Sequence, residues 1–389
     1  MTVDTSEEGT AALSGGAVAE RQAVEAAVKA GEAVLAHRFG SAISLVAPEV
    51  LAGSGPATVV RARIATSPFG LPRTLVIKHY PDPAPEHAPD PFAQEAVSYQ
   101  LFTALSADER MCPELLAHDG GHRVLVIDDL GRAPTLQDKL LGSDARAAER
   151  SLLSWARSLG RLHATTAGRE ADFDALLRRL GGPARDEGAD PATACAQLPE
   201  LLEKSLGVTT PVPVGRFAER ARERASSPAY RAFSPVDLSP DNNLVTSGGV
   251  RFLDFERGRV RNALIDAAHL RVPFASCAEP LALPAGMSEA MLAAWRAEVS
   301  VVWPKLADTE ALDAHLLDHQ LLVLCVKTWE ALAGRGDTPA SLVTWWRQLG
   351  DYAERQDESA LAGYARAVSA AMDVRFGPGL ELPLYPAFR

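Results

Sequence analysis

The sequence lacks the features that would define several function classes. It has 39 Lys and Arg against 50 Asp and Glu, which gives a formal net charge of −11 at pH 7. Binding to nucleic-acid phosphates requires clustered basic residues, so no nucleic-acid partner is expected. The four cysteines are widely spaced and form neither a CxxC pair nor a Cys/His cluster. This spacing argues against a structural zinc site and a disulfide framework, and it suits a reducing cytoplasm.

Segments for export or membrane insertion are also missing from the sequence. Residues 1–20 have neither a basic start nor an apolar stretch of signal-peptide length. No window approaches the apolar length of a transmembrane helix. We therefore expect a soluble, cytoplasmic protein without a membrane partner. The sequence indicates no oligomeric state.

The sequence does contain an ordinary globular composition and clear local patterns. Hydrophobic residues make up 47% and charged residues 23% of the 389 residues, which suffice for two domains or lobes. Residues 1–20 predict a disordered tail, and residues 23–39 predict a helix. A helix is also predicted over 91–105, where Pro91 suits the first turn. Between these helices, β-branched runs separated by Gly, Pro and Ser predict an antiparallel meander at 42–52, 57–66 and 73–80.

The rest of the chain is predicted to be mainly helical. A short apolar strand at 124–127 precedes a long amphipathic helix at 146–166. An Asp/Asn/Pro-rich loop at 234–243 interrupts the helices and leads into two short strands. The sequence therefore predicts an α+β, two-lobed fold, in which a small antiparallel-sheet lobe with one helix accompanies a large helical lobe. The predicted parts are an N-terminal tail and helix at 1–40, the small lobe at 41–130 and the large lobe at 131–389.

A loop and a strand in the second half carry the residues with the clearest chemistry. Asp237 and Asn242 lie five positions apart on the Pro-rich loop, and Asp254 follows 17 residues after Asp237, at the end of a strand. The loop alone would be read as a turn, because Asn, Asp and Pro favour turns. The second Asp changes this interpretation. Phosphoryl transfer needs hard oxygen ligands for Mg²⁺ and a carboxylate near the attacking hydroxyl, and these three residues meet both needs.

Two charged residues upstream strengthen this interpretation. Lys78 ends the apolar strand Thr74-Leu75-Val76-Ile77-Lys78, and Glu95 follows 17 residues later on the only helix predicted for the small lobe. Taken singly, each residue is more commonly a solvated surface group. Their order and spacing favour an ion pair between them.

Together these residues resemble the signature motifs of kinases. Asp237 to Asn242 matches the D-x-x-x-x-N catalytic loop, Asp254-Phe255 matches the start of the DFG segment, and the strand ending in Lys78 resembles the V-A-I-K strand. The sequences of these motifs are most similar to those of the aminoglycoside phosphotransferase and choline kinase superfamily, which has a protein-kinase-like fold. The resemblance implies that Asp237 is the catalytic carboxylate and that Asn242 and Asp254 bind Mg²⁺. It also implies that Lys78, paired with Glu95, binds the phosphates of ATP, with GTP as an alternative donor, and that a small molecule accepts the phosphate on a hydroxyl.

Two further nucleotide-binding segments match the superfamily less strictly. Gly53-Ser54-Gly55 partly matches the glycine-rich loop over the phosphates, but Thr58 stands where the third Gly would be. A plain hairpin turn explains this segment almost as well. Ile127, Asp128 and Asp129 correspond to the hinge whose backbone binds adenine, and the alternative is a strand that runs into a turn.

The catalytic loop departs from the superfamily pattern at three positions. Pro235 replaces the His that normally lies two residues before the catalytic Asp, Ser239 replaces a frequent His or Lys, and Asp241 replaces a Gly. The missing His questions the geometry of the loop more than its chemistry, and Ser239 leaves a cation near the γ-phosphate to come from elsewhere. Asp266 is expected to brace the backbone of the loop, and His163 is expected to be packed rather than catalytic.

We therefore expect an ATP-dependent phosphotransferase acting on a small molecule of the antibiotic, amino alcohol, sugar or nucleoside type. A kinase of peptide or protein Ser and Thr is one alternative, although residues 255–266 leave little room for an activation segment. A non-catalytic nucleotide-binding scaffold is another, and only Pro235 and Ser239 favour it. Acidic residues of the C-terminal helices would suit a cationic acceptor, but a solvated helix face is the more common arrangement. These residues are Asp308, Glu310, Asp313, Asp318 and Glu330.

Overall fold

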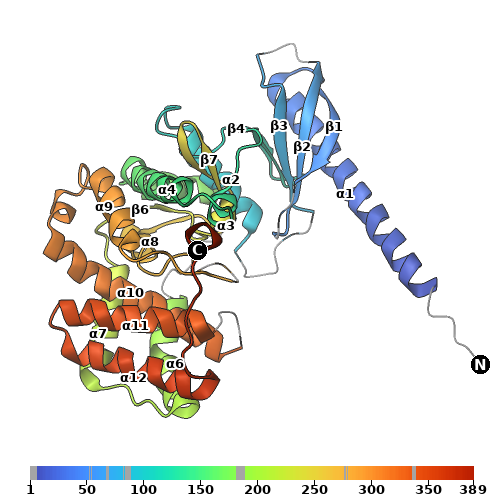
Figure 1. The fold of residues 1–389 in the computed structure, drawn as a ribbon. Helices are drawn as coiled ribbons and strands as arrows, with labels where there is room; N and C mark the ends of the chain where they lie inside the picture. Colours follow the sequence, from blue (N-terminus) through green and yellow to red (C-terminus); the bar gives the residue numbers. More distant parts are fainter. Residues whose placement is uncertain are drawn as a thin grey trace, which may run out of the picture. The chain divides into compact units, whose positions relative to one another are not determined.

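The computed structural model divides into two compact units. Unit 1 contains a five-stranded antiparallel sheet, and unit 2 is larger and mainly helical (Figure 1). The predicted α+β fold class is confirmed. Unit 1 comprises Met1–Ser106, Cys112–Arg132 and Leu176–Pro183, and unit 2 comprises Ala107–Met111, Ala133–Ala175 and Ala184–Arg389. The structure describes residues 7–51, 53, 55–66, 70–81, 83, 89–180, 189–275, 277, 279–334 and 339–389, apart from the side chains of 7–17, 189 and 190.

Five strands form the sheet of unit 1: β1 (Ser44–Val50), β2 (Thr58–Thr66), β3 (Thr74–His79), β4 (Leu115–Asp119) and β5 (Val124–Asp128). They lie in the order β1-β2-β3-β5-β4, and each neighbouring pair is antiparallel. The predicted meander is confirmed as β1 to β3. Lys78 on β3 pairs with Val59 on β2 and Leu125 on β5, so it lies in the central strand of the sheet.

A long helix packs on this sheet. α1 (Glu7–Phe39) lies along β1, β2 and β3 (Figure 1) and shares with them a buried apolar cluster that includes Leu35 and Ile77. Gly31 permits this close approach, because a Cβ at that position would lie 2.9 Å from Ile77 Cδ1. The apolar face of α1 therefore completes the core of unit 1.

The N-terminal helix begins earlier than the sequence predicted. A disordered tail was expected over 1–20 and a helix only over 23–39, but the chain is helical from Glu7. The expected tail is therefore wrong from Glu7 onward, and residues 1–6 lie outside the described residues. The Ala and Glu content of this segment favours a helix even without an apolar period, which explains the difference.

The second helix of unit 1 carries Glu95. α2 (Pro91–Thr103) begins after Asp90, whose carboxylate accepts a hydrogen bond of 3.1 Å from the Phe92 N–H. Pro91 occupies the first helical position, where no backbone N–H is needed. The helix predicted over 91–105 is confirmed to within two residues at its end. Its side chains from Phe92 to Phe102 are mostly buried.

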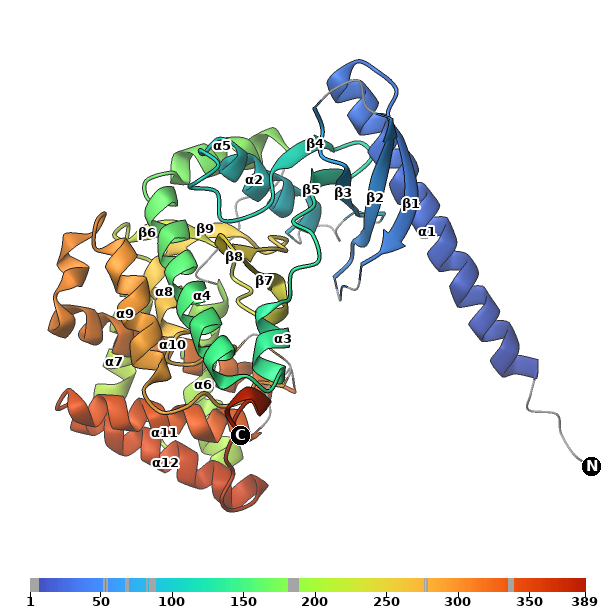
Figure 2. The same ribbon diagram turned by 45° about the horizontal axis from the view of Figure 1, so that its top comes forward.

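Unit 2 is organised around a buried cluster that helices share. Trp345 and Trp346 contribute to this cluster, and α11 and α12 lie side by side in both views (Figures 1 and 2). α5 runs from unit 2 into residues that belong to unit 1. The helices are α3 (Leu136–Leu141), α4 (Ala145–Thr166), α5 (Glu170–Arg179), α6 (Ala189–Leu206), α7 (Val212–Ala225), α8 (Ala263–Ala268), α9 (Met287–Val299), α10 (Thr309–Leu332), α11 (Pro339–Arg355) and α12 (Ser359–Phe376), with 3₁₀ turns at Pro240–Asn242, Pro304–Ala307 and Pro386–Phe388.

Two short antiparallel ribbons are set among the helices of unit 2 (Figure 2). β6 (Arg231–Ser234) pairs with β9 (Arg259–Asn262), and β7 (Asn243–Thr246) pairs with β8 (Gly249–Phe252). The loop with Asp237 connects the two ribbons in one direction, and the segment with Asp254 connects them in the other. The predicted strands after the loop are confirmed.

Two general properties follow from the described part of the chain. No helix there combines the length and the apolar character needed to cross a membrane. All four cysteines are described, and each is a free thiol.

The contact between α4 and α9 provides a test of packing. A Cβ on Gly160 would lie 2.7 Å from the Trp295 carbonyl oxygen and 2.9 Å from Glu298 Cβ. Overpacking costs about 1–3 kcal/mol, and the better helix propensity of Ala recovers up to about 1 kcal/mol, so Gly160→Ala should lower the free energy of unfolding by about 1–2 kcal/mol. Urea denaturation measures this change.

A matched control lies in another helix. At Gly363 of α12, an added Cβ would have no atom of the described residues within 4 Å, so Gly363→Ala should leave stability unchanged or raise it by up to about 1 kcal/mol. Similar free energies of unfolding for the two variants would contradict the close helix contact at Gly160.

Candidate functional site

The β7–β8 ribbon brings Asn242 and Asp254 to the same place. Asn243 pairs with Phe252, and the Leu253 N–H donates a hydrogen bond of 2.8 Å to the Asn242 carbonyl oxygen. Asn242 and Asp254 therefore lie directly outside the last paired residues of the two strands. Phe255, which is fully buried, anchors the next position by an edge-on contact with Phe233 of β6, 5.2 Å between ring centroids.

The carboxylate of Asp237 is held within its own loop. Its Oδ1 accepts hydrogen bonds from the Ser239 N–H at 3.0 Å and from the Ser239 hydroxyl at 2.6 Å. Ser239 is itself pinned, because its carbonyl oxygen accepts from the Asn242 N–H at 3.1 Å and from the Asn243 side chain at 2.5 Å. Ser239, noted as a departure from the superfamily pattern, thus orients Asp237 in this chain.

Three carboxylates of this region lie close enough to interact electrostatically. Partial desolvation raises the pKa of Asp241, and the carboxylates of Asp237 and Asp254 raise it further. Such a concentration of negative charge, beside the amide oxygen of Asn242, is the environment that a hard divalent cation stabilises. The donor set therefore fits Mg²⁺. In the described residues, no three or more His, Cys, Asp or Glu side chains are grouped so that they could hold a metal ion, and Mg²⁺ usually takes few protein ligands beside waters and substrate phosphates.

The backbone is strained on both sides of this cluster. Val236 has φ of 69° and Asp254 has φ of 62°, in the left-handed region that L-residues rarely adopt. Each such residue costs on the order of 1–3 kcal/mol and persists only where the surroundings hold it. The Val236 N–H donates to the Ser234 hydroxyl at 3.0 Å, which supplies one such restraint. Strain of this kind is concentrated at functional sites.

Asp266 is the centre of the buried network that supports the loop. Its carboxylate accepts a hydrogen bond of 2.9 Å from the Ser234 hydroxyl and is paired with the Arg261 guanidinium. Arg261 Nε also donates to the Ser234 oxygen at 2.9 Å, so the hydroxyl that restrains Val236 has all its partners. The expectation that Asp266 braces the loop is thereby refined, because its contact with the loop runs through the Ser234 side chain.

His163 closes the other side of this network. It is fully buried, and its Nε2 lies 3.0 Å from Asp266 Oδ2. Trp295 Nε1–H donates to His163 Nδ1 at 2.9 Å, so Nδ1 is an acceptor and the proton resides on Nε2, which donates to Asp266. Burial opposes ionisation of Asp266, but the Arg261 charge and the hydrogen bonds from His163 and Ser234 outweigh it and hold the pKa of this carboxyl far below its usual value. These contacts fit the packed role expected for His163.

Unit 1 contributes a buried ion pair. Lys78 Nζ lies 2.6 Å from Glu95 Oε1, which confirms the predicted pairing, and the two side chains are only 8% and 0% exposed. The Tyr80 hydroxyl donates to the other oxygen, Glu95 Oε2. Transfer of each charge from water costs several kcal/mol, so this is not the solvated surface pair that either residue alone would suggest.

The remaining nucleotide-binding candidates also lie in unit 1. Gly53 and Gly55 are in the turn between β1 and β2, and Ser54 lies outside the described residues. Ile127 and Asp128 end β5, where the Asp128 N–H already donates to the Glu114 carbonyl oxygen at 2.8 Å.

Asp129 follows β5 and is held by an arginine. Arg61 donates two hydrogen bonds of 2.9 Å to its carboxylate and one of 3.1 Å to the Gly131 carbonyl oxygen. Burial alone would raise the pKa of Asp129, but hydrogen bonds from Arg61, Thr74 and the Gly131 N–H lower it. The segment after β5 is therefore held in place by Arg61.

The predicted solvated acidic face of the C-terminal helices is only partly present. Asp318 is completely buried and pairs with Arg220 and Arg224, so the prediction is wrong for this residue. Asp313 pairs with Arg271. The sequence alone did not reveal that α10 is buried around Asp318.

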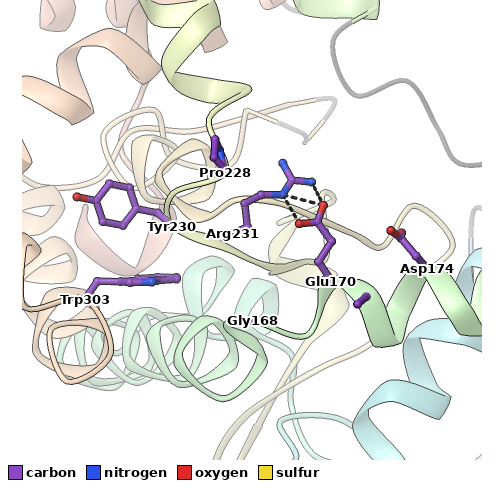
Figure 3. Close-up of a pocket in the computed structure, with 8 residues that line it drawn as sticks. Gly168, Glu170, Asp174, Pro228, Tyr230, Arg231 and Trp303 are labelled. Carbon is purple, nitrogen blue, oxygen red and sulfur yellow. Dashed lines mark hydrogen bonds and ion pairs between the residues drawn. The ribbon is translucent and has the colours of Figure 1, made fainter.

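A separate pocket of about 440 Å³ opens at the start of β6. Figure 3 shows Glu170 and Arg231 paired on one side and Tyr230 near Trp303 on the other. Tyr230 has φ of 58° and precedes the strand that leads to Ser234. The residues that line the pocket are Gly168, Glu170, Ala171, Asp174, Pro228, Tyr230, Arg231 and Trp303.

The sequence did not predict three residues that support the site, which are Tyr80, Ser234 and Arg261. Tyr80 lies two positions after Lys78, and the alternation of side chains along an extended chain could have indicated that both face Glu95. Ser234 and Arg261 carried no such signal. They meet because β6 pairs with β9, and short strands of this kind are not readable from local pattern.

Known proteins match this chain in structure rather than in sequence. No family model matches the sequence, and no curated protein matches it significantly. A choline kinase from Streptococcus pneumoniae is 14% identical, with a TM-score of 0.43 over 82% of this chain and 94% of that chain. A proposed aminoglycoside phosphotransferase from Ralstonia eutropha is 14% identical, with a TM-score of 0.49 over 89% and 98%. A proposed fructosamine-3-kinase from Thermobifida fusca is 17% identical, with a TM-score of 0.44 over 86% and 96%.

These names fall within the aminoglycoside phosphotransferase and choline kinase superfamily, which the motifs of this chain resemble. Because the TM-scores are below 0.5 and the identities below 20%, the three structures assign neither an activity nor a substrate to this chain.

Proposed function

We propose that the chain is an ATP-dependent phosphotransferase that moves the γ-phosphate to a hydroxyl of a small molecule. The observation that supports this most is the buried ion pair between Lys78 and Glu95. A buried ion pair contributes little net stability, since desolvation offsets the attraction between the charges. A cation held in this way, at the end of a central strand, is suited to binding nucleotide phosphates.

The residues of unit 2 supply the other chemical requirements. Asp237 would accept or orient the proton of the acceptor hydroxyl, and Ser239 holds one carboxylate oxygen so that the other can meet the acceptor. Asn242 and Asp254 would hold Mg²⁺, which neutralises charge on the nucleotide phosphates when bound. Residues 41–130 would then form the nucleotide-binding part, and 131–389 the part with the catalytic loop and the acceptor site.

The short segment after Asp254 favours a small-molecule acceptor over a peptide. Phe255 is packed in the core, and Arg259–Asn262 is paired with β6 immediately afterwards. Little chain remains before α8 for a segment that could bind a peptide. The antibiotic, amino alcohol, sugar and nucleoside classes stay open. The hydrogen bonds from Ser239 to Asp237 also argue against the scaffold alternative, because this departure leaves the proposed catalytic carboxylate oriented.

The test is ADP release measured across panels of hydroxyl acceptors and peptides, with Asp237→Asn as the inactive reference. Activity with a small acceptor and none with peptides is expected. Nucleotide binding without turnover on any acceptor would leave the scaffold function instead.

The four free thiols further suit the cytoplasm that we propose as the location of this protein.

Nucleotide binding is predicted to depend on Lys78. Millimolar ATP or GTP with Mg²⁺ should raise the thermal midpoint of the unmutated chain. A nucleotide present at one hundred times its Kd raises the free energy of unfolding by about 2.7 kcal/mol. Lys78→Met should lose most of this shift. It also leaves Glu95 buried without this cation, so the variant is expected to be less stable, and its shift is measured from its own nucleotide-free midpoint. Lys29→Met is the matched control, because Lys29 is exposed on α1. No shift in the unmutated chain with either nucleotide would reject the proposed function.

A further inference from the structure

Unit 2 contains a second pocket, apart from the catalytic loop. It has a volume of about 330 Å³ and is bordered by α9, α10, the end of α11 and the segment after α8. Its polar and charged lining residues are Arg271, Glu289, Arg296, Thr309, Asp313, Tyr352, Arg355 and Gln356. A pocket of this size accommodates a small organic molecule.

Arg271 is the unusual residue of this pocket. Its side chain is only 5% exposed, and its Nη2 is paired with Asp313. Its guanidinium lies over the Tyr352 ring, 4.2 Å from the centroid. Nε and Nη1, which carry three of the five guanidinium N–H groups, have no hydrogen-bond partner among the described residues. Buried charged donors without acceptors are costly, so their presence beside a cavity indicates a missing acceptor.

The charged residues around the cavity indicate the charge of the missing acceptor. Three arginines line it, whereas Glu289 and Asp313 are the acidic residues of the lining. Both acids already have partners: Asp313 binds Arg271, and Glu289 accepts from the Tyr352 hydroxyl at 2.9 Å. The lining is thus net positive in a chain whose formal charge is −11. An anion is favoured there by charge and by the spare donors together.

The rim of the pocket can admit a ligand. The Arg355 guanidinium also lies over the Tyr352 ring, 4.4 Å from the centroid, and its side chain is 61% exposed. Arg296 donates to the Thr309 hydroxyl at 2.7 Å. Exposed side chains change rotamer rapidly, so Arg355 can turn toward an entering anion.

We propose that this pocket is a binding site for a small oxyanion of the phosphate or carboxylate class, with Arg271 as its anchor and Arg296 and Arg355 at its rim. The site is distinct from the catalytic loop, because none of residues 234–243 lines this pocket. The proposal goes beyond the phosphotransferase function and does not depend on it.

Calorimetric titration of the full chain tests the site. The probes are inorganic phosphate and, separately, succinate, at constant ionic strength maintained with chloride. Saturable binding of at least one probe is expected, and the stronger probe identifies the preferred class of oxyanion. Arg271→Lys should weaken that binding tenfold or more, because an ammonium keeps the charge but lacks the fixed guanidinium donors.

Two control variants separate this site from other anion sites. Lys78→Met alters the proposed nucleotide site and should leave affinity for the probe unchanged. Arg347→Lys changes an arginine that is likewise paired with an aspartate, Asp373, but lies outside the pocket, and it should also have no effect. If Arg271→Lys does not fold, the double variant Arg296→Gln and Arg355→Gln at the rim should weaken binding several-fold.

Three outcomes would overturn the proposal. The first is the absence of saturable binding of either probe to the unmutated chain. The second is binding that Lys78→Met abolishes and Arg271→Lys retains, which would assign the anion to the nucleotide site. The third is unchanged affinity in both the folded Arg271→Lys variant and the rim double variant.

Discussion

Replacing Asp237 by Asn is expected to lower phosphate transfer by about 100-fold or more, the usual contribution of a positioned general base. An Asn at this position keeps an oxygen that can accept both hydrogen bonds from Ser239, so the loop should retain its shape. Mg²⁺-dependent nucleotide affinity should stay close to that of the unmutated chain. Turnover and nucleotide affinity are measured side by side, with background ATP hydrolysis as the rate if no acceptor is found.

The comparison with Asp254→Asn separates the two aspartates. Asp254 is proposed to hold the metal, so its replacement should reduce both nucleotide affinity and turnover. Asp108→Asn, at an exposed position of unit 2, is the surface control and should change neither. Undiminished turnover in Asp237→Asn would remove this residue from the mechanism. Loss of nucleotide binding in Asp237→Asn would instead assign it a role in binding the metal.

Replacing Asp266 by Asn is expected to lower the free energy of unfolding by about 3–5 kcal/mol, because the Arg261 charge would then stay buried without its partner. Asp266 is completely buried, and the Arg261 side chain is 8% exposed. The substitution should also weaken the hydrogen bond between Ser234 and residue 266. Ser234 would then restrain the strained backbone at Val236 less firmly. Urea denaturation measures the stability, and turnover should fall even in the folded fraction.

Two comparisons identify the buried charge as the cause. Glu354→Gln breaks an ion pair with Arg366 in which both side chains are more than half exposed, and it should cost less than about 1 kcal/mol. Adding Arg261→Met to Asp266→Asn removes the unpaired cation and should recover part of the loss. A cost for Asp266→Asn no larger than that for Glu354→Gln would contradict the network.

The same ion pair determines how this cost changes with pH. The pKa of Asp266 is lowered in the folded chain, so the unfolded chain takes up a proton first as pH falls through the usual carboxyl range. The stability that this carboxylate contributes is present above that range and is lost below it. The difference in free energy of unfolding between the unmutated chain and Asp266→Asn should therefore become smaller below about pH 4.

Local patterns in the sequence were sufficient for much of the scaffold. Short β-branched runs bounded by Gly, Pro and Ser predicted β1 to β3, and Pro91 predicted the first turn of α2, because these signals depend on neighbours within one element. The pairing of Lys78 with Glu95 was also predicted and is present. The catalytic role of Asp237 and the metal-binding roles of Asn242 and Asp254 remain predictions from motifs.

The N-terminal helix and α10 mark where local pattern was insufficient. Residues 7–20 have no apolar period, yet they are helical. Asp318 lies on a helix whose acids suggested a solvated face, yet it is buried between two arginines. Both errors come from reading a segment by itself, whereas burial depends on what packs against it.

By itself the sequence determined the strand that carries Lys78, the helix that carries Glu95 and the ribbon that brings Asn242 to Asp254. Each depends on residues within a few positions of one another, where periodicity and turn chemistry act directly. Only the tertiary structure decided which side chains support these elements. Strand pairing brings Ser234 to Arg261, and helix packing places Arg271 in the lining of the second pocket. Such polar contacts join distant segments, and no period in the chain encodes which buried donor will meet which acceptor.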